Sequence, residues 1–410
     1  MTETTPNRRP EPFTIDVAQD VLDDLRNRLK ATRFAQDLDN EDEYYGLSTA
    51  YLKPLVEYWA TDFDWRAVEK EFNSFARYRV ELGGTPIQFI HEPGKGPNPV
   101  PLLLLHGWPW PPQSYHAMIG PLTDPAAYGG DPADAFDVVV ADLPGFAHST
   151  PVGRGDLNYW KMADLFHELM TDVLGYEKFA VGGADYGALV TTQLGHKYAK
   201  NLYGVHLGHE MTPGIFQNDR FWDLTGGAAV PTEPGRLRDD VLHMNETLVS
   251  HVAVHMLDAQ SITHGFNDSP AGMLAWLVRK WKTWSDRWGD FEKVFPRDAI
   301  LGAATVYWVN QALGSSIRVY RNSVRHPWQP SHDRQPLIEV PAGFTFLVGD
   351  TFPPGVRTPA ERIAAFENGP TRSAFNAVNV NAHSDGGHFG PYENPEAWIG
   401  DLRNTFRPLR

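Results

Sequence analysis

The chain has 410 residues, of which 42% are hydrophobic, enough to bury a large core in one fold that carries insertions. Its formal charge of −15 argues against nucleic acid or an anionic membrane surface as a partner. Cysteine is absent, so disulfides, thiolate metal sites and cysteine nucleophiles are excluded. The polar stretch Met1–Pro12 lacks the apolar region of a signal peptide, and no apolar run could span a bilayer. We therefore expect a soluble, cytoplasmic protein without a membrane anchor.

A mostly helical leader is predicted to precede the first strands. Apolar residues at helical spacing indicate three helices, at 14–33, 51–59 and 63–72. Thr14 or Asp16 is expected to cap the first of them. The apolar period then changes to two, which predicts a hairpin of strands 76–82 and 87–91.

The rest of the chain alternates buried strands with helices, a pattern typical of a parallel α/β sheet. The predicted strands are 100–105, 136–141, 177–181, 202–207, 342–348 and 374–380. The predicted core helices are 160–174 and 396–406, and three further helices, 242–257, 270–281 and 303–320, fall in one long interval without strands. We expect such an insertion to form a cap over the strand ends, where open α/β sheets bind ligands.

The predicted fold class is therefore α/β, with a mostly parallel central sheet, an inserted helical cap and an N-terminal helical extension. The expected domain organisation follows the changes of pattern along the chain. It comprises an N-terminal helical segment with the first strands (1–95), a first core part (96–212), the helical cap (213–335) and a second core part (336–410).

A nucleophile elbow is predicted at Gly183-Ala184-Asp185-Tyr186-Gly187, between a strand and a helix. The turn is strained and crowded, so the positions two residues either side of the nucleophile must be nearly free of side chain. Here the central residue is aspartate, and a carboxylate at that point can attack an electrophilic carbon and form an ester. On the pentapeptide alone, the alternative that Asp185 merely caps the next helix stays open.

In α/β-hydrolases the nucleophile is followed along the chain by an acid and then by a histidine. His388 is the candidate base, because two glycines precede it just beyond the last predicted strand. The acid is expected to be Asp350, which ends a strand and can hold the imidazole tautomer. Glu361 is the competing acid, although it lies in a predicted helix.

The loop His106-Gly107-Trp108-Pro109 follows the first buried strand of the core. In such folds one oxyanion-hole N–H comes from this loop and the other from the residue after the nucleophile. The amides of Trp108 and Tyr186 are therefore the candidate oxyanion hole, whereas an ordinary turn is the simpler interpretation of the loop motif alone.

From about Pro12 to its C-terminus the chain resembles the microsomal-type epoxide hydrolases, which add an N-terminal segment to the α/β-hydrolase fold. The matching motifs are Asp64-Trp65-Arg66, His106-Gly107-Trp108-Pro109, Leu143-Pro144-Gly145-Phe146, Asp268-Ser269-Pro270, Ser315-Ser316 with Arg318 and Tyr320, and Gly386-Gly387-His388-Phe389. Each motif is weak alone, but together they are specific. Counting from the family's Val-Pro-x-Gly strand, here beginning at Val340, also places the acid at Asp350.

The resemblance implies an epoxide hydrolase that forms a vicinal diol through a covalent aspartyl ester. It also implies ring-opening proton donors from the cap: Tyr320 matches one family tyrosine, and His251 takes the place of the other. Two further departures are Tyr186, where the family usually has tryptophan, and a longer segment between Asp350 and His388. Packing roles for Tyr320 and His251 are the alternatives.

The resemblance leaves the substrate open, and the aromatic cap suggests a bulky, aryl-bearing epoxide. Soluble bacterial relatives include enzymes of natural-product biosynthesis, some acting on epoxides of enediyne precursors. We expect no cofactor and no metal, with the epoxide and water as the small-molecule partners; a homodimer stays open. The alternative functions are a haloalkane dehalogenase-type hydrolase and a catalytically inactive hydrolase-fold binding protein. Turnover of a test epoxide would separate all three.

Overall fold

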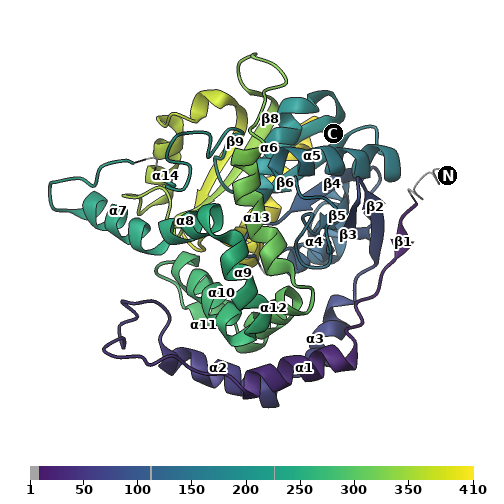
Figure 1. The fold of residues 1–410 in the computed structure, drawn as a ribbon. Coiled ribbons are helices and arrows are strands. Elements are labelled where there is room, and N and C mark those ends of the chain that lie inside the picture. Colours follow the sequence, from purple (N-terminus) through teal and green to yellow (C-terminus); the bar gives the residue numbers. More distant parts are fainter. Residues whose placement is uncertain (1–8, 111–112, 226) are drawn as a thin grey trace.

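The computed structural model describes residues 9–110, 113–225 and 227–410, so residues 1–8 of the predicted N-terminal segment lie outside it. Within these ranges the strands form one sheet in the order β1-β2-β3-β5-β4-β6-β7-β8-β9 (Figure 1). The strands are β1 Glu11–Pro12, β2 Arg77–Leu82, β3 Thr85–Glu92, β4 Val100–Leu105, β5 Phe136–Ala141, β6 Phe179–Gly183, β7 Leu202–Leu207, β8 Ile338–Leu347 and β9 Phe375–His383.

The sheet has an antiparallel edge and a parallel body. The β2–β3 hairpin pairs antiparallel with β1 and β5, whereas β5, β4, β6, β7, β8 and β9 run parallel to one another. Every residue of β4 is buried, as its continuous apolar sequence predicts. The predicted α/β fold with a mostly parallel sheet is confirmed.

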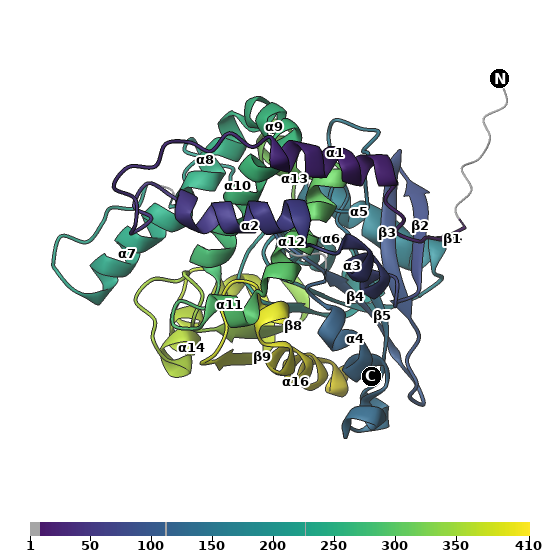
Figure 2. The ribbon, with the colours of Figure 1, turned by 90° about the horizontal axis from the view of Figure 1, so that it is seen from below.

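Helices cover both faces of this sheet. Helices α5 (Tyr159–Glu168) and α6 (Tyr186–Lys197) lie on one face, and α4 (His116–Thr123) and α16 (Pro395–Phe406) lie on the other (Figure 2). Of the shorter helices, α14 (Pro359–Glu367) connects β8 to β9, and α15 (Gly390–Glu393) lies between β9 and α16. Because the body is parallel, all its strand ends of one sense, and the loops that follow them, meet at one edge.

The cap consists of helices between β7 and β8. They are α7 Arg236–Thr247, α8 Val249–Leu257, α9 Ala259–Asp268, α10 Pro270–Trp284, α11 Phe291–Val294, α12 Arg297–Val309 and α13 Ala312–Arg325. Two predicted helices are each divided, because the chain bends at Leu248 and again at Gln311, which has a left-handed φ of 49°. Helices α9 and α11 were not predicted.

The N-terminal helices pack against the cap rather than against the sheet (Figures 1 and 2). They are α1 Gln19–Lys30, α2 Thr49–Thr61 and α3 Trp65–Phe72, and α1 begins later than predicted. Residues 15–17 are instead extended: the amide of Ile15 donates to Asn73 Oδ1 (2.9 Å) and that of Val17 to Glu69 Oε1 (2.8 Å). Thr14 and Asp16 are therefore not caps, because α3 takes the amides of this segment.

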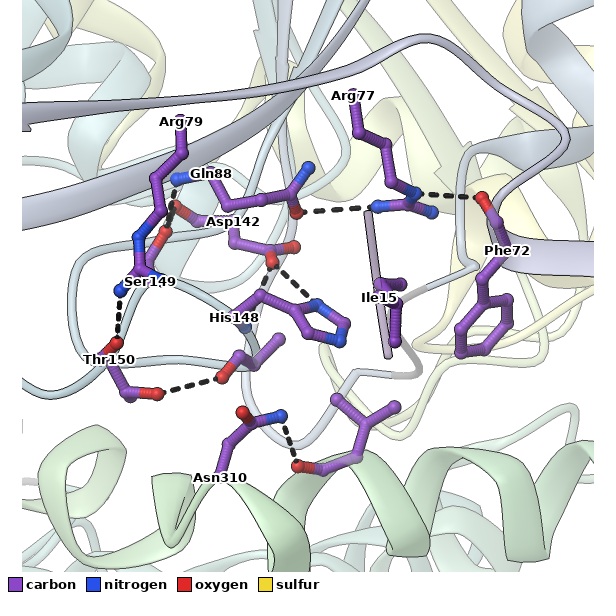
Figure 3. Close-up of polar contacts among 12 residues, drawn as sticks. Ile15, Phe72, Arg77, Arg79, Gln88, Asp142, His148, Ser149, Thr150 and Asn310 are labelled. Atoms are coloured by element: carbon purple, nitrogen blue, oxygen red, sulfur yellow. Dashed lines mark hydrogen bonds and ion pairs between the residues drawn. The ribbon is translucent and has the colours of Figure 1, made fainter. Parts of the chain in front are cut away.

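A buried polar cluster fixes the loop after β5 (Figure 3). Both the amide and the Nδ1 of His148 lie on Asp142 Oδ2, at 3.1 and 3.2 Å. Ser149 Oγ donates to the Asp142 carbonyl and accepts from the Gln88 amide, each at 2.9 Å. The guanidinium of Arg77 donates to Gln88 Oε1, so strands β2 and β3 are connected to this loop. Burial opposes ionisation, but the hydrogen bond from His148 and the nearby positive charges lower the pKa of Asp142.

Candidate active site

Asp185 occupies a sharp turn between β6 and α6. It has a φ of 51° and a ψ of −122°, a backbone conformation that costs energy for any residue other than glycine. A Cβ on Gly183 would lie 2.5 Å from the Gly187 carbonyl, and a Cβ on Gly187 would collide with the Leu105 carbonyl. Only glycine therefore fits two residues either side of Asp185, as an elbow requires.

The loop after β4 lies against the Asp185 carboxylate. The amide of Trp108 donates to Asp185 Oδ1 at 2.8 Å. Gly107 permits this approach, because a Cβ there would lie 2.6 Å from the same oxygen. Tyr186 is the first residue of α6, so its amide is one of the helix N-terminal donors without an intrahelical acceptor. Both predicted oxyanion donors thus belong to backbone that borders Asp185.

His106 holds the Trp108 loop in place. Its Nδ1 donates to the Gly107 carbonyl (2.9 Å) and its Nε2 accepts from the Leu143 amide (3.0 Å). The loop after β4 is therefore fastened to the loop after β5, which the Asp142 cluster fixes in turn.

His388 is buried between two carboxylates. Its Nε2 lies 3.4 Å from Asp185 Oδ2 and its Nδ1 lies 3.7 Å from Asp350 Oδ1. These are ion-pair distances, longer than a formed N–H···O hydrogen bond. Burial opposes the charged form, yet the interactions with Asp185 and Asp350 raise the pKa of His388 to about 10. The imidazole is therefore cationic at neutral pH.

Of the two candidate acids, Asp350 is the one that the structure brings to His388. Burial alone would raise the pKa of Asp350, but the hydrogen bond from His209 and the interaction with the charged His388 hold it well below its usual range. Glu361 lies on α14, where its carboxylate accepts from the Arg357 amide (2.7 Å) and pairs with Arg236 (3.1 Å).

Tyr320 and His251 lie in the cap, over the elbow. The ring of Tyr320 packs on Tyr186 with 4.7 Å between centroids and on His251 with 5.6 Å. Burial, together with the charge of Asp185, raises the pKa of Tyr320 well above 10. The phenol is therefore protonated throughout the neutral range and has a proton to donate.

His251 is oriented differently from what proton donation requires. Its Nδ1 lies 2.5 Å from the Leu248 carbonyl, and because a carbonyl only accepts, the Nδ1 carries a proton. The Nε2 of the neutral ring is then an acceptor. Burial and the nearby charges of His255 and Lys280 lower the pKa of His251 well below 6.5. Donation from Nε2 would need the imidazolium, which these surroundings disfavour.

Two residues that the sequence analysis did not single out contact the predicted triad. His209, after β7, accepts from the Asp185 amide through Nδ1 (2.8 Å) and donates to Asp350 Oδ2 through Nε2 (2.9 Å). Glu393 accepts from the amides of Gly387 (3.0 Å) and Phe389 (2.9 Å), which flank His388. His209 follows a strand end, a signal that was available; Glu393, on a short helix, carries no comparable signal.

A cavity of about 560 Å³ connects the core residues to the cap. Its polar lining includes Asp185, His209, Asp350 and His388 on the core side and His251 and Tyr320 on the cap side. Its apolar lining includes Met211, Ile215, Phe216, Leu224, Leu248, Val252, Trp284 and Phe352. The volume is that of an ordinary small-molecule site.

Among the described residues, one group of side chains could hold a metal ion. The ligand atoms of His209, Asp350 and His388 lie within 4.8 Å of one another. Their donors and acceptors already serve each other: Asp350 pairs with both imidazoles, and the remaining nitrogen of His209 accepts the Asp185 amide. Hydrogen bonding within the set accounts for this convergence.

Comparison with known proteins agrees with this geometry. Residues 10–113 match the family described as epoxide hydrolase N terminus, and residues 100–239 match the alpha/beta hydrolase fold. A Stigmatella aurantiaca relative assigned to the epoxide hydrolases is 33% identical over 401 residues, covering 97% of this chain and 85% of its own. Epoxide hydrolase 1 of Oryctolagus cuniculus is 26% identical, covering 95% and 87%. The protein is thus an α/β-hydrolase-fold enzyme, and it belongs to the epoxide hydrolase family.

Solved structures give the same result. The epoxide hydrolase of Aspergillus niger superposes with a TM-score of 0.77 at 25% identity, covering 99% of both chains. The juvenile hormone epoxide hydrolase of Bombyx mori shares the fold, with a TM-score of 0.74 at 23% identity over 99% and 95% of the two chains. Among the described residues, no helix is long and apolar enough to cross a membrane.

Proposed function

We propose that this epoxide hydrolase acts through a covalent ester on Asp185. The observation that carries the proposal is the placement of His388 between Asp185 (3.4 Å) and Asp350 (3.7 Å), with the protonated phenol of Tyr320 on the cap side of the same cavity. A carboxylate below and a proton donor above are what nucleophilic opening of an epoxide needs. The ester would be held through its carbonyl oxygen by the amides of Trp108 and Tyr186.

The same geometry accounts for the second step. While Asp185 is ionised, His388 is cationic and cannot act as a base. Esterification removes one of the two negative charges that raise the pKa of His388, which brings the imidazole toward its neutral form. His388, held by Asp350, then takes a proton from the water that attacks the ester carbonyl. His388 therefore becomes able to act as a base only after the ester has formed.

A single turnover in ¹⁸O-labelled water, with enzyme in excess over epoxide, tests this route. Water attacks the carbonyl carbon, so the oxygen transferred to the diol comes from Asp185. We expect an unlabelled first-turnover diol and ¹⁸O in the peptide that contains Asp185. If every diol molecule instead carries one ¹⁸O and the peptide is unlabelled, water has added directly to the epoxide.

The lining of the cavity supports a bulky, aryl-bearing epoxide as substrate. Phe216, Trp284, Tyr320 and Phe352 all border the 560 Å³ space, which exceeds what a small aliphatic epoxide would fill. A polycyclic intermediate of natural-product biosynthesis belongs to the same class. We expect kcat/KM to be higher for styrene oxide than for propylene oxide, and higher again for a naphthyl epoxide. The reverse order would contradict this assignment.

A further inference from the structure

His209 is the polar residue that joins the nucleophile's backbone to the acid. It follows the carboxyl end of β7 and lines the cavity. Its side chain is 15% exposed. The last bond between the two neighbouring strands is donated by the Gly208 amide to the Gly183 carbonyl (3.1 Å). At Asp185 the chain leaves the sheet, and its amide finds His209 Nδ1 as acceptor at 2.8 Å.

The two hydrogen bonds of His209 fix its tautomer. A backbone amide can only donate, so Nδ1 must offer its lone pair to Asp185. The ring proton therefore lies on Nε2, 2.9 Å from Asp350 Oδ2. Asp350 uses its other oxygen for His388 Nδ1, at 3.7 Å. These contacts link four residues in a ring: the Asp185 amide contacts His209, His209 contacts Asp350, Asp350 contacts His388, and His388 contacts the Asp185 carboxylate.

We propose that His209 is a positioning residue for the water-activating step, because it shares the charge of Asp350 with His388 and holds the elbow amide. This inference rests on the proposed ester mechanism. A carboxylate that accepts a short hydrogen bond from one imidazole stabilises a second imidazolium less. Once Asp185 is esterified, His209 thus lowers the pH at which His388 loses its proton and becomes a base.

Several charged or titratable groups surround His388. Among them is Glu393, which accepts from the amides of Gly387 and Phe389 on either side of His388 and whose pKa burial raises to about 7. Asp185 and Asp350 contact His388 directly, and His209 packs on it with 4.6 Å between ring centroids. Across the cavity lie His251 on α8 and the ion pair of Glu210 with Arg362, whose nitrogen and oxygen are 3.2 Å apart. Neither of these is hydrogen-bonded to Asp350, so His209 is the group whose removal changes that carboxylate directly.

The test compares His209→Phe with His206→Phe. Phenylalanine keeps the ring but removes both nitrogens. His206 is the matched control because it is fully buried in β7, the strand that His209 follows, and also makes two hydrogen bonds, to Thr405 (3.0 Å) and Thr345 (2.8 Å), but none to the triad. In a third variant, His209→Gln, an amide again offers one acceptor and one donor.

Single-turnover rates of ester formation and ester hydrolysis are measured between pH 5 and 9. In His209→Phe we expect the acid limb of ester hydrolysis to move to higher pH by about one unit, which slows hydrolysis about tenfold below that limb. His209→Gln is expected to restore part of the shift, and His206→Phe to keep the wild-type limb. An unchanged limb in His209→Phe, or an equal shift in His206→Phe, would overturn the proposal.

A measurement on the wild type tests the same proposal even if a phenylalanine variant does not fold. Ring ¹⁵N shifts, assigned to His209 by difference from His209→Gln, should show a proton on Nε2 and an acceptor at Nδ1. A proton on Nδ1 would overturn the proposal without any phenylalanine variant. If a single turnover of the wild type in ¹⁸O-labelled water leaves the peptide that contains Asp185 unlabelled, the covalent mechanism fails instead, and that outcome is visible before any His209 variant is made.

Discussion

The core wall of the cavity and its cap wall satisfy their polar groups in different ways. On the core wall, Asp185, His209, Asp350 and His388 each come from a turn at a strand end, and they contact one another through ion pairs and hydrogen bonds. On the cap wall, His251 and Tyr320 come from helices and pack mainly through their rings. The core wall therefore carries charge, whereas burial keeps the cap wall neutral.

Under the proposed mechanism, this difference would divide the two halves of the chemistry between the two walls. A nucleophile and a base need groups that change charge, and the core wall supplies them with partners that stabilise each state. The departing alkoxide needs a proton donor that is always protonated, and a buried phenol provides that without titrating at neutral pH.

Asp350→Ala should break the charged wall, whereas Glu361→Ala should leave it intact. Without Asp350, His388 loses the partner that orients its ring and stabilises its imidazolium, and His209 loses its acceptor. We expect ester hydrolysis to slow by about 10³–10⁴-fold, measured by single-turnover kinetics. Glu361 interacts with Arg236 on the surface, so Glu361→Ala should hydrolyse the ester at a near wild-type rate. A severe loss only in Glu361→Ala would reassign the acid.

Tyr320→Phe should remove the proton donor of the neutral wall. General acid catalysis typically contributes about 10²–10⁴-fold, so we expect ester formation to slow by that factor while hydrolysis of the ester changes little. Tyr159→Phe is the matched control. Tyr159 is also a fully buried phenol packed on Tyr186 (4.8 Å between centroids), its hydroxyl has no partner among the described residues, and it does not line the cavity. Equal rates of ester formation in both variants would remove Tyr320 from the mechanism.

The residues of the core wall were largely predictable, because glycines and the ends of apolar runs mark the ends of strands in the sequence. Asp185 lies between two required glycines, Asp350 ends an apolar run, and His388 follows two glycines. His209 also follows a strand, at Gly208, but the expected order of nucleophile, acid and histidine left no place for a fourth residue. The missed element is thus a tertiary contact: His209 matters because β7 lies between β6 and β8 in the sheet.

The cap wall was predicted less well, because its helices lack such marks. The apolar spacing continues through Leu248 and Gln311, so the sequence gives no sign of the bends that divide two predicted helices. The bend at Leu248 also decides the chemistry of His251, since the carbonyl of Leu248 takes its Nδ1 proton. His251, which was expected in the place of a family tyrosine, lies on α8 of the cap, and its tautomer depends on this local geometry.

His251→Phe should sharpen the comparison further. The ring stacks on Trp108 with centroids 5.5 Å apart and planes 7° apart, and phenylalanine can keep that packing. Because Nε2 of the neutral ring has no proton to give, we expect ester formation to slow by less than about threefold, far below the general-acid range. Pre-steady-state rates from pH 5 to 8 provide the measurement. A loss comparable with that in Tyr320→Phe would make His251 the second donor.

Lys280→Met tests whether a lysine buried within the cap lowers the stability of the protein. Lys280 is 3% exposed on α10, and its ammonium lies over the Trp276 and Trp284 rings (4.9 and 5.7 Å), with a hydrogen bond to Ser250 Oγ (2.9 Å). Burial lowers its pKa to about 7. Between pH 7 and 10.5 the unfolded chain binds more protons than the folded one, so wild-type stability rises with pH across this window.

In Lys280→Met this rise of stability with pH is absent, because methionine does not titrate. We expect Lys280→Met to exceed the wild type in free energy of unfolding by about 1–3 kcal/mol at pH 7, with the difference shrinking toward zero near pH 10. Urea unfolding at the two pH values provides the measurement, and Lys282→Met, which removes an ion pair with Glu43 from the same helix, controls for loss of a lysine. A variant less stable than the wild type at pH 7 would show that the two indole rings and Ser250 stabilise the ammonium fully.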